Sequence, residues 1–303
     1  MISVIMAVYK EDVSLLKQSI ESILNQTYRD FEYVIVLDDP DNDEAIELIR
    51  GYEQQDSRLH FFINEKNSGP AITRNNAFNK TSGDYIAVMD ADDIAEKNRL
   101  EMELSYLNEH KLDLIGSYSN IIDENGHFQY VVNNVPTKEK SILKALKYNQ
   151  VVSHPTFFLR REVFTQLKGY RAIPLCEDYD FTLRAALHSF HIGNMPEIGL
   201  QYRMTTSSVS RTSLYKQYLY MVYLTRQYSK HLEADVDQAK AFVESKYSEN
   251  RAMSYAKANV NFNKALYALK NKKLISFIFH SIKLFSSPSY LNKIYRLIRA
   301  SLC

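Results

Sequence analysis

Cysteine and long hydrophobic runs are scarce in this chain of 303 residues. Its two cysteines, Cys176 and Cys303, provide neither a disulfide framework nor the spacing of a metal site, so a reducing compartment is the simplest expectation. No stretch approaches the roughly eighteen apolar residues of a transmembrane helix, and the longest candidate, "LISFIFHSIKLF", is interrupted by His280 and Lys283. The apolar start "MISVIMAVY" follows no basic segment and favours a first strand over a signal peptide. We therefore expect a cytoplasmic protein.

Acidic residues are missing from the end of the chain. Overall, 37 Lys and Arg residues nearly balance 36 Asp and Glu residues, which gives no reason to expect a nucleic-acid partner. Residues 250–303, however, contain ten Lys or Arg residues and no Asp or Glu. The remaining sequence is acidic, so the chain consists of an acidic body with a basic end.

Apolar runs and amphipathic segments alternate through the first ninety residues. The runs predict buried strands and the segments predict helices. The expected strands are 2–8, 33–37, 59–63 and 85–89, and the expected helices are 13–26, 43–55 and 70–79. This alternation predicts an α/β fold with a mixed, mostly parallel, Rossmann-like sheet flanked by helices. In such sheets ligands bind beyond the carboxyl ends of the strands.

The alternation weakens after Asp93. Residues 112–123 and 127–132 predict a hairpin, residues 154–159 a short strand, and residues 177–189 a helix. From about residue 213 the pattern is helical and rich in tyrosine, and we expect a domain boundary near residue 211.

Three carboxylates end the fourth expected strand in "YIAVMDADDI". A single Asp at such a place is usually a turn or helix-capping residue. Asp90, Asp92 and Asp93 together are different, because clustered carboxylates repel and need a proton or a cation. With Asp38 at the end of the second strand, they form an oxygen-only set suited to Mg²⁺ or Mn²⁺ completed by phosphate oxygens. Such an ion would make a diphosphate a better leaving group.

Several separated motifs carry a family resemblance. "SVIMAVYKED", "SILNQTYRDFEYVIVLDDPDND", "NSGPAITRNNAF", "GDYIAVMDADDI", "HPTFFLRREVF" and "CEDYDFTLR" resemble, in order and spacing, the inverting family 2 glycosyltransferases with the GT-A fold. The resemblance covers residues 1–210, with a nucleotide-binding half at 1–93 and an acceptor half at 94–210. It leaves residues 211–303 outside, as a helical extension.

The resemblance implies a role for each matched position. Asp92 matches the metal-coordinating aspartate, and Asp90 matches its partner near the ribose and the metal. The positions that match the nucleotide-sugar site are Ala7, Tyr9, Asp38, Arg74 and Asp90, with Asp38 receiving the uracil N3–H and Tyr9 stacking on the base. Leu37 replaces an acid of the family pattern beside Asp38, and Thr205 stands where many members carry a His.

Asp178 matches the catalytic base of the family. In an inverting transfer, one carboxylate near the acceptor hydroxyl suffices as a general base. From the residues alone, Glu177 or Asp180 fits as well, and so does a pair of helix-capping acids. A His before a strand, such as His154, is more often structural.

The resemblance implies a metal-dependent hexosyltransferase. It would move a sugar from a UDP-sugar to a hydroxyl of a glycan or lipid-linked acceptor in bacterial surface polysaccharide synthesis, of O-antigen, capsule or lipooligosaccharide. One alternative, a nucleotidyltransferase, usually carries a glycine-rich loop after strand one, and "MAVYKEDVS" has no glycine. The other is a catalytically silent nucleotide-sugar-binding partner in an assembly.

Residues 271–303 predict two basic amphipathic helices. The apolar face of the first comprises Leu274, Ile275, Ile278, Ile282 and Phe285, and that of the second comprises Leu291, Ile294, Tyr295 and Ile298. Such helices suit an anionic membrane, which would place the protein peripherally on the inner face of the cytoplasmic membrane. The alternative is that they pack on the acidic body or form a homodimer interface.

Overall fold

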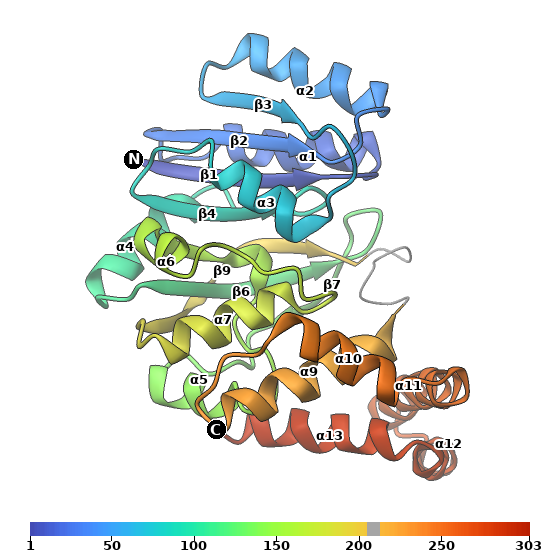
Figure 1. The fold of residues 1–303 in the computed structure, drawn as a ribbon. Helices are drawn as coiled ribbons and strands as arrows, with labels where there is room; N and C mark the ends of the chain where they lie inside the picture. Colours follow the sequence, from blue (N-terminus) through green and yellow to red (C-terminus); the bar gives the residue numbers. More distant parts are fainter. Residues whose placement is uncertain (205–212) are drawn as a thin grey trace. The chain divides into compact units, whose positions relative to one another are not determined.

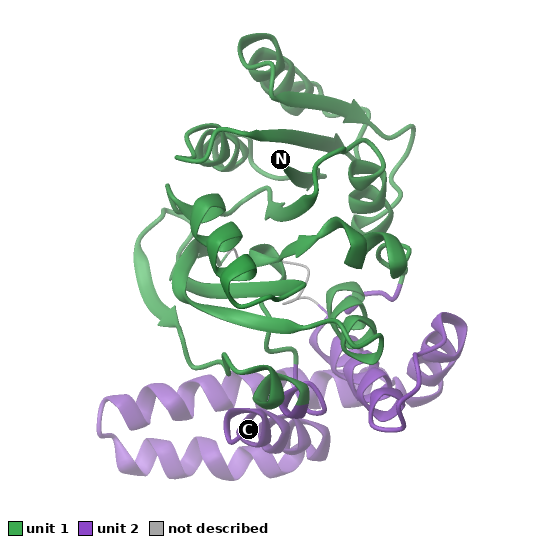
Figure 2. Cartoon of the chain, turned by 90° about the vertical axis from the view of Figure 1, so that its left-hand side faces the viewer, with its two compact units in different colours: residues 1–143, 150–172, 177–205 green, residues 144–149, 173–176, 206–303 purple. Residues whose placement is uncertain are grey.

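The computed structural model describes residues 1–204 and 213–303, which divide into two compact units (Figure 2). The first unit consists of Met1–Leu143, Gln150–Ala172 and Glu177–Thr205, and the second consists of Lys144–Asn149, Ile173–Cys176 and Thr206–Cys303. The boundary expected near residue 211, like Thr205, lies outside the described residues. No helix in the described ranges is long and apolar enough to cross a membrane.

One mixed sheet forms the framework of the first unit. Its strands are β1 (Ile2–Val8), β2 (Phe31–Leu37), β3 (Leu59–Ile63), β4 (Tyr85–Asp90), β5 (Ile94–Ala95), β6 (Leu114–Ile122), β7 (Phe128–Val132), β8 (Phe158–Arg160) and β9 (Ile192–Arg203). Their order is β3-β2-β1-β4-β8-β6-β9-β5, and β7 pairs with β6. β1 to β4 are parallel, β8 is antiparallel to β4 and β6, and β9 is parallel to β6. The predicted α/β sheet is confirmed.

Helices cover both faces of the parallel strands. Residues 1–204 contain α1 (Val13–Leu24), α2 (Asp43–Gln55), α3 (Pro70–Phe78), α4 (Arg99–Glu109), α5 (Glu139–Ala145), the 3-10 helix η1 (His154–Thr156), α6 (Arg161–Gln166) and α7 (Glu177–Leu187). Apolar side chains of α1, α2 and α4 join those of β1, β2 and β4 in one buried cluster, whereas α3 lies on the opposite face from α1 (Figure 1). Burial on both faces explains why β1 and β2 are continuous apolar runs.

β9 is the longest strand that the sequence pattern failed to predict. Its sequence, "IGNMPEIGLQYR", includes Pro196 and two glycines, which are rare inside strands. The pairing with β6 passes from Met195 opposite Ser117 to Ile198 opposite Tyr118, so Pro196 lies at an irregularity of the ladder. The strand expected at residues 154–159 is also partly wrong, because η1 precedes β8 there.

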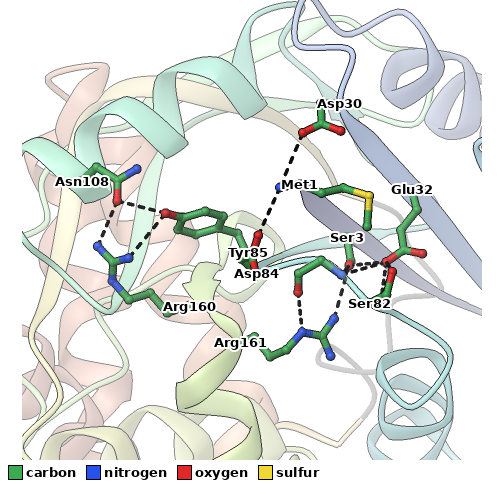
Figure 3. Close-up of polar contacts among 11 residues, drawn as sticks. Met1, Ser3, Asp30, Glu32, Ser82, Asp84, Tyr85, Asn108, Arg160 and Arg161 are labelled. Carbon is green, nitrogen blue, oxygen red and sulfur yellow. Dashed lines mark hydrogen bonds and ion pairs between the residues drawn. The ribbon is translucent and has the colours of Figure 1, made fainter.

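Contacts at the amino ends of β1, β2 and β4 close one edge of the sheet (Figure 3). The Met1 ammonium lies 3.5 Å from Asp30 and 3.3 Å from Asp84. Ser3 on β1 donates to Glu32 on β2 at 2.7 Å, and the same Glu32 carboxylate accepts the N–H of Gly83 before β4 at 3.0 Å. The polar groups at the amino ends of these strands are thus paired with one another. Ligands of such sheets bind at the opposite edge, beyond the carboxyl ends of the strands.

Tyrosine rings form the core of the second unit. Its helices are α9 (Leu214–Tyr228), α10 (Val236–Lys246), α11 (Glu249–Lys270), α12 (Leu274–Ile282), the 3-10 helix η2 (Lys283–Ser286) and α13 (Pro288–Ser301). The ring of Tyr255 lies 5.3 Å from Tyr215, 5.3 Å from Tyr218 and 5.0 Å from Tyr290, centroid to centroid. The Tyr290 hydroxyl donates to Asn259 at 2.9 Å. Packing of these buried rings against one another accounts for the tyrosine-rich sequence.

A buried ion pair connects α4 to the sheet. Arg99 and Glu103 are both fully buried, with Arg99 Nε 2.9 Å from Glu103 Oε1. Arg99 also donates to the Val88 carbonyl of β4 at 2.9 Å. Burial raises the pKa of Glu103 to about 7 despite the opposing effect of Arg99. The arginine therefore needs its partner, because an unpaired buried charge is costly.

We expect Glu103→Ala to lower the free energy of unfolding by about 3–5 kcal/mol, because it leaves Arg99 buried without its carboxylate. Urea denaturation at pH 8 measures the loss. Glu109→Ala, at the exposed end of the same helix, is the matched control and should change stability by about 0.5 kcal/mol or less. Equal effects of the two variants would show that the buried pair is not needed for stability.

Candidate active site

The ends of β1, β2 and β4 bring the sequence-predicted residues to one edge. Ala7 on β1 is paired in register with Val36 on β2 and with Asp90 on β4. Tyr9 and Asp38 follow directly from the same strands. The parallel arrangement therefore gathers Ala7, Tyr9, Asp38 and Asp90, as the sequence predicts.

Arg74 on α3 joins this edge to the start of α7. Its guanidinium donates to Asp90 at 2.9 Å and to Glu177 at 3.4 Å, and its side chain is only 11% exposed. Burial lowers the pKa of Arg74, but Asp90 and Glu177 raise it by more, so the net pKa lies above the usual value. For Asp90, burial raises the pKa, and Arg74 and His154 lower it by more. Arg74 thus holds acids from two distant parts of the sequence in one site.

Asp92 lies in a strongly negative environment. Burial raises its pKa to about 7, with further contributions from Asp90 and Glu11. Glu11 accepts the backbone N–H of Tyr9 at 2.6 Å, and burial raises its own pKa. The sequence prediction missed Glu11, although an acid three residues past the end of β1 was a signal that could have been used.

Arg203, the last residue of β9, fixes the turn that carries Asp92. Its side chain is 3% exposed and donates from Nε to the Asp92 carbonyl at 2.8 Å. Its backbone N–H donates to Asp93 at 2.7 Å. Burial and the charges of Asp92 and Asp90 raise the pKa of Asp93 well above its usual value, and its Oδ2 atom has no hydrogen-bond partner among the described residues. No local pattern indicates this role of Arg203, because the role depends on a contact between residues 111 positions apart.

The carboxylates fit a divalent cation that a ligand helps to hold. In residues 1–204 and 213–303, no group of three or more His, Cys, Asp or Glu side chains is arranged to hold a metal ion by itself. Burial is nevertheless the largest cause of the raised pKa of Asp92, and the charges of Asp90 and Glu11 add to it, so a bound cation would favour the ionised carboxylate. Mg²⁺ and Mn²⁺ suit one or two carboxylates plus phosphate oxygens. The donor set is therefore suitable once a phosphate-bearing ligand completes it.

Asp38 is nearly buried and organises the loop before α3. Its Oδ1 atom accepts from the Asn64 amide at 2.7 Å and from the Ser68 N–H at 2.9 Å, while Oδ2 accepts from the Gly69 N–H at 2.8 Å. Each carboxylate oxygen has two lone pairs, so Oδ2 retains capacity for one more donor. Its contact to a nucleobase stays a prediction, as does stacking by Tyr9, whose side chain is 40% exposed.

Three acids at the start of α7 have three different environments. Asp180 is buried between Arg171 and Arg184, which both donate to it, with Arg184 Nε at 2.9 Å. Glu177 is paired with Arg74. Asp178 has no cationic hydrogen-bond partner in the described residues, and burial together with Glu177 raises its pKa to about 7. Of the three candidate bases, Asp178 is the one without an arginine hydrogen bond within residues 1–204 and 213–303, and its raised pKa of about 7 suits a proton acceptor.

His154 is a neutral structural residue. Its Nε2 atom lies 3.0 Å from the Tyr170 hydroxyl, and its ring packs edge-on against Phe157. Burial, with a further effect of Arg74, lowers its pKa to about 3. It therefore carries no charge near pH 7, and the structural interpretation of this residue fits these contacts.

We expect Asp92→Asn to stabilise the protein at pH 8 in the absence of divalent ions. The pKa of Asp92 is raised in the folded state above the usual 3.8, so ionisation costs folding free energy that accumulates as pH rises toward about 7. The gain should be on the order of 1–4 kcal/mol at pH 8 and should approach zero near pH 4. Thermal unfolding at both pH values, with EDTA, measures it. Asp41→Asn removes an exposed carboxylate and should show no such pH-dependent gain; a loss of stability in Asp92→Asn would contradict the like-charge argument.

The sequence of this chain is similar to those of known glycosyltransferases. Residues 3–167 match the family model described as Glycosyl transferase family 2. The chain is 37% identical over 232 residues to an uncharacterized glycosyltransferase of Methanocaldococcus jannaschii, covering 76% of this chain and 80% of that protein. It is 34% identical over 216 residues to the O-antigen biosynthesis glycosyltransferase WbnJ of Escherichia coli, covering 71% and 84%.

Two solved structures share the fold at low sequence identity. The S. aureus TarS 1–349 structure in complex with UDP-GlcNAc gives a TM-score of 0.61 at 17% identity, covering 91% of this chain and 89% of that one. The mannosyltransferase PcManGT of Pyrobaculum calidifontis, in complex with GDP-Man and Mn²⁺, gives 0.61 at 12% identity, covering 98% and 86%. Together with the mixed sheet and its flanking helices, these likenesses confirm the predicted GT-A fold class.

Proposed function

The chain belongs to glycosyl transferase family 2, and on that premise we propose a metal-dependent, inverting transfer of a sugar from a UDP-sugar to a hydroxyl of a glycan or lipid-linked acceptor. The observation that carries the proposal is the Arg74 bridge between Asp90 and Glu177. It supports a single site that contains both the acids near Asp92 and the candidate base Asp178. Membership of this family gives no support to the nucleotidyltransferase alternative.

Asp178 is suited to act as the general base. In an inverting transfer the acceptor oxygen attacks the anomeric carbon while the bond to the diphosphate breaks on the opposite face, and the hydroxyl proton passes to the base. A pKa of about 7 keeps Asp178 largely ionised just above neutrality, yet basic enough to accept the proton. Glu177 and Asp180 fit this role less well, because each is already bound by arginine.

The donor would occupy the carboxyl edge, with Asp92 and Asp90 toward its diphosphate. A divalent ion bound there neutralises charge on the departing diphosphate. Asp92 would hold Mn²⁺ or Mg²⁺, Asp38 would accept the N–H of the base, and Ala7 and Tyr9 would line the nucleotide. Support comes from the solved TarS and PcManGT complexes, which carry UDP-GlcNAc in one case and GDP-Man with Mn²⁺ in the other.

The acceptor proposal rests on the relatives. WbnJ of E. coli is named as an O-antigen biosynthesis enzyme, which favours a role in bacterial surface polysaccharide synthesis for this chain as well. Acceptors in such synthesis are often linked to lipid. We therefore place the reaction on the cytoplasmic side, at the inner face of the membrane.

We expect Asp178→Asn to lower kcat by about 10²–10⁴-fold, because the variant keeps the size and polarity of the side chain but loses the proton acceptor. Binding of the UDP-sugar, measured by calorimetry, should be little changed. In the wild type, kcat/KM should rise with pH up to about 7 and then level off, and this rise should weaken in the variant.

Asp180→Asn is the control for Asp178→Asn. It should lower the melting temperature, because it weakens the contacts with Arg171 and Arg184. Turnover of Asp178→Asn near the wild-type rate would move the base to Glu177. Wild-type binding of the UDP-sugar with no turnover for any acceptor would favour the silent-binder alternative.

We expect UDP to raise the melting temperature of the EDTA-treated protein strongly only when Mn²⁺ or Mg²⁺ is added. Saturation to a hundred times Kd stabilises by about 2.7 kcal/mol. Asp92→Ala should lose the metal-dependent part of this shift and should lose transfer, whereas Asp41→Ala should keep both. Wild-type turnover by Asp92→Ala in EDTA-treated buffer would show that the metal assignment is wrong.

A further inference from the structure

The helix α12 presents its apolar face to solvent. None of its residues is buried, and the apolar side chains along one face are largely exposed. The exposed fractions are 66% for Leu274, 87% for Ile275, 48% for Ile278, 55% for Phe279 and 63% for Ile282. We call these five residues, with Phe285 of η2 at 72%, the α12 face.

The side of α12 that is less exposed is mixed in polarity. Ser276, Phe277, His280 and Ser281 are half-buried, and His280 Nδ1 lies 2.9 Å from Asn261 on α11. A surface helix of a globular protein normally buries its apolar stripe and exposes its polar one. In α12 the most apolar side lies in solvent instead, without a partner in the described residues, and such patches usually mark an interaction site.

Lysines surround the α12 face. The α11–α12 connection contains Lys270, Lys272 and Lys273, all exposed, and Lys283 lies 3.9 Å above the ring of Phe279. These two helices form an antiparallel pair, in the purple unit of Figure 2. No Asp or Glu occurs anywhere in residues 250–303. The surface is therefore both apolar and uniformly cationic.

The basic residues of α13 are used differently. Arg296 donates to Thr225 on α9 at 2.7 Å, and Arg299 donates to the Tyr148 hydroxyl at 3.2 Å. Tyr290 and Ala300 of the same helix are buried. These contacts lie within the second unit, so the basic residues of α13 contribute to the packing of that unit.

We propose that the α12 face and its surrounding lysines bind the surface of an anionic lipid bilayer. An interfacial helix inserts its apolar side chains at the level of the headgroups, and each nearby Lys gains from the negative surface potential. A second copy of the chain is the competing occupant. A symmetric dimer through this face would oppose lysine to lysine with no acid to pair them, which disfavours it.

The proposed membrane contact rests on the proposed function in one respect: it would bring the active site to a lipid-linked acceptor. The physical argument depends on the exposure and charge of α12 alone. Vesicle binding therefore needs no donor, metal or acceptor, and its result is separate from the test of catalysis.

The experiment is co-sedimentation of the full-length protein with vesicles of phosphatidylcholine, with and without phosphatidylglycerol. We expect binding to the anionic vesicles at low salt, and release at high salt because salt screens the lysines. Lys270→Glu/Lys272→Glu/Lys273→Glu should weaken the partition coefficient by about a hundredfold or more. Ile275→Ser/Ile278→Ser/Ile282→Ser should abolish detectable binding, because it removes the side chains that insert.

Matched control variants carry the same kinds of substitution outside the α12 face. Phe128→Ser removes an exposed aromatic side chain from the first unit, and Lys111→Glu/Lys138→Glu/Lys140→Glu reverses three exposed charges there. Both should bind vesicles like the wild type, and circular dichroism should show every variant folded. UDP and Mn²⁺ should stabilise the α12 variants as they do the wild type, so that loss of vesicle binding is distinguished from loss of the site.

Three results would overturn the proposal. The first is a wild-type protein that does not bind anionic vesicles at low salt. The second is α12 variants that bind these vesicles as well as the wild type does. The third is a wild-type protein that binds no vesicles but is a dimer in light scattering, and that the isoleucine substitutions convert to a monomer. The third result would assign the α12 face to another copy of the chain.

Discussion

Crowding of negative charge at the carboxyl edge of the parallel strands is the constraint on which the site depends. Glu11, Asp90, Asp92 and Asp93 lie close enough to perturb one another, and Arg74 donates to Asp90 alone among them. The fold holds them there through backbone contacts, since Arg203 donates to the Asp92 carbonyl and Ser19 donates to the Asp90 carbonyl. Arg203 and Arg99 offset only part of the effect of burial and like charge, so the pKa values of Asp92 and Asp93 stay raised, which favours binding of a cation.

Arginine partners distinguish the three neighbouring acids at the start of α7. Along the first turns of α7, Glu177 and Asp180 receive arginine partners and Asp178 does not. The three carboxylates thus differ in their surroundings, and at Asp178 burial together with Glu177 raises the pKa. The pairing also explains why the site needs α3, since Arg74 is the residue that engages Glu177 while binding Asp90.

Local pattern was enough to predict the first half of the fold. β1 to β4 and the helices between them follow from apolar periodicity, because each element buries its own side chains against its sequence neighbours. The family resemblance placed Asp92 and Asp178 at one site, and Arg74 links their surroundings. The resemblance did not predict the roles of Glu11 and Arg203, because these roles arise from contacts between residues far apart in the sequence. β9 was missed because Pro196 and two glycines hide a strand whose pairing with β6 is set by tertiary contacts.

The end of the chain shows the limit of periodicity most clearly. A helical repeat tells which residues share a face, but it does not tell which face meets solvent. In α13, Arg296 and Arg299 make contacts within the second unit, and in α12, His280 contacts Asn261 of α11. Both helices leave apolar side chains exposed, but α13 has buried residues and α12 has none. Because exposed apolar area costs free energy in water, the orientation of α12 is favourable only where that face meets something other than water.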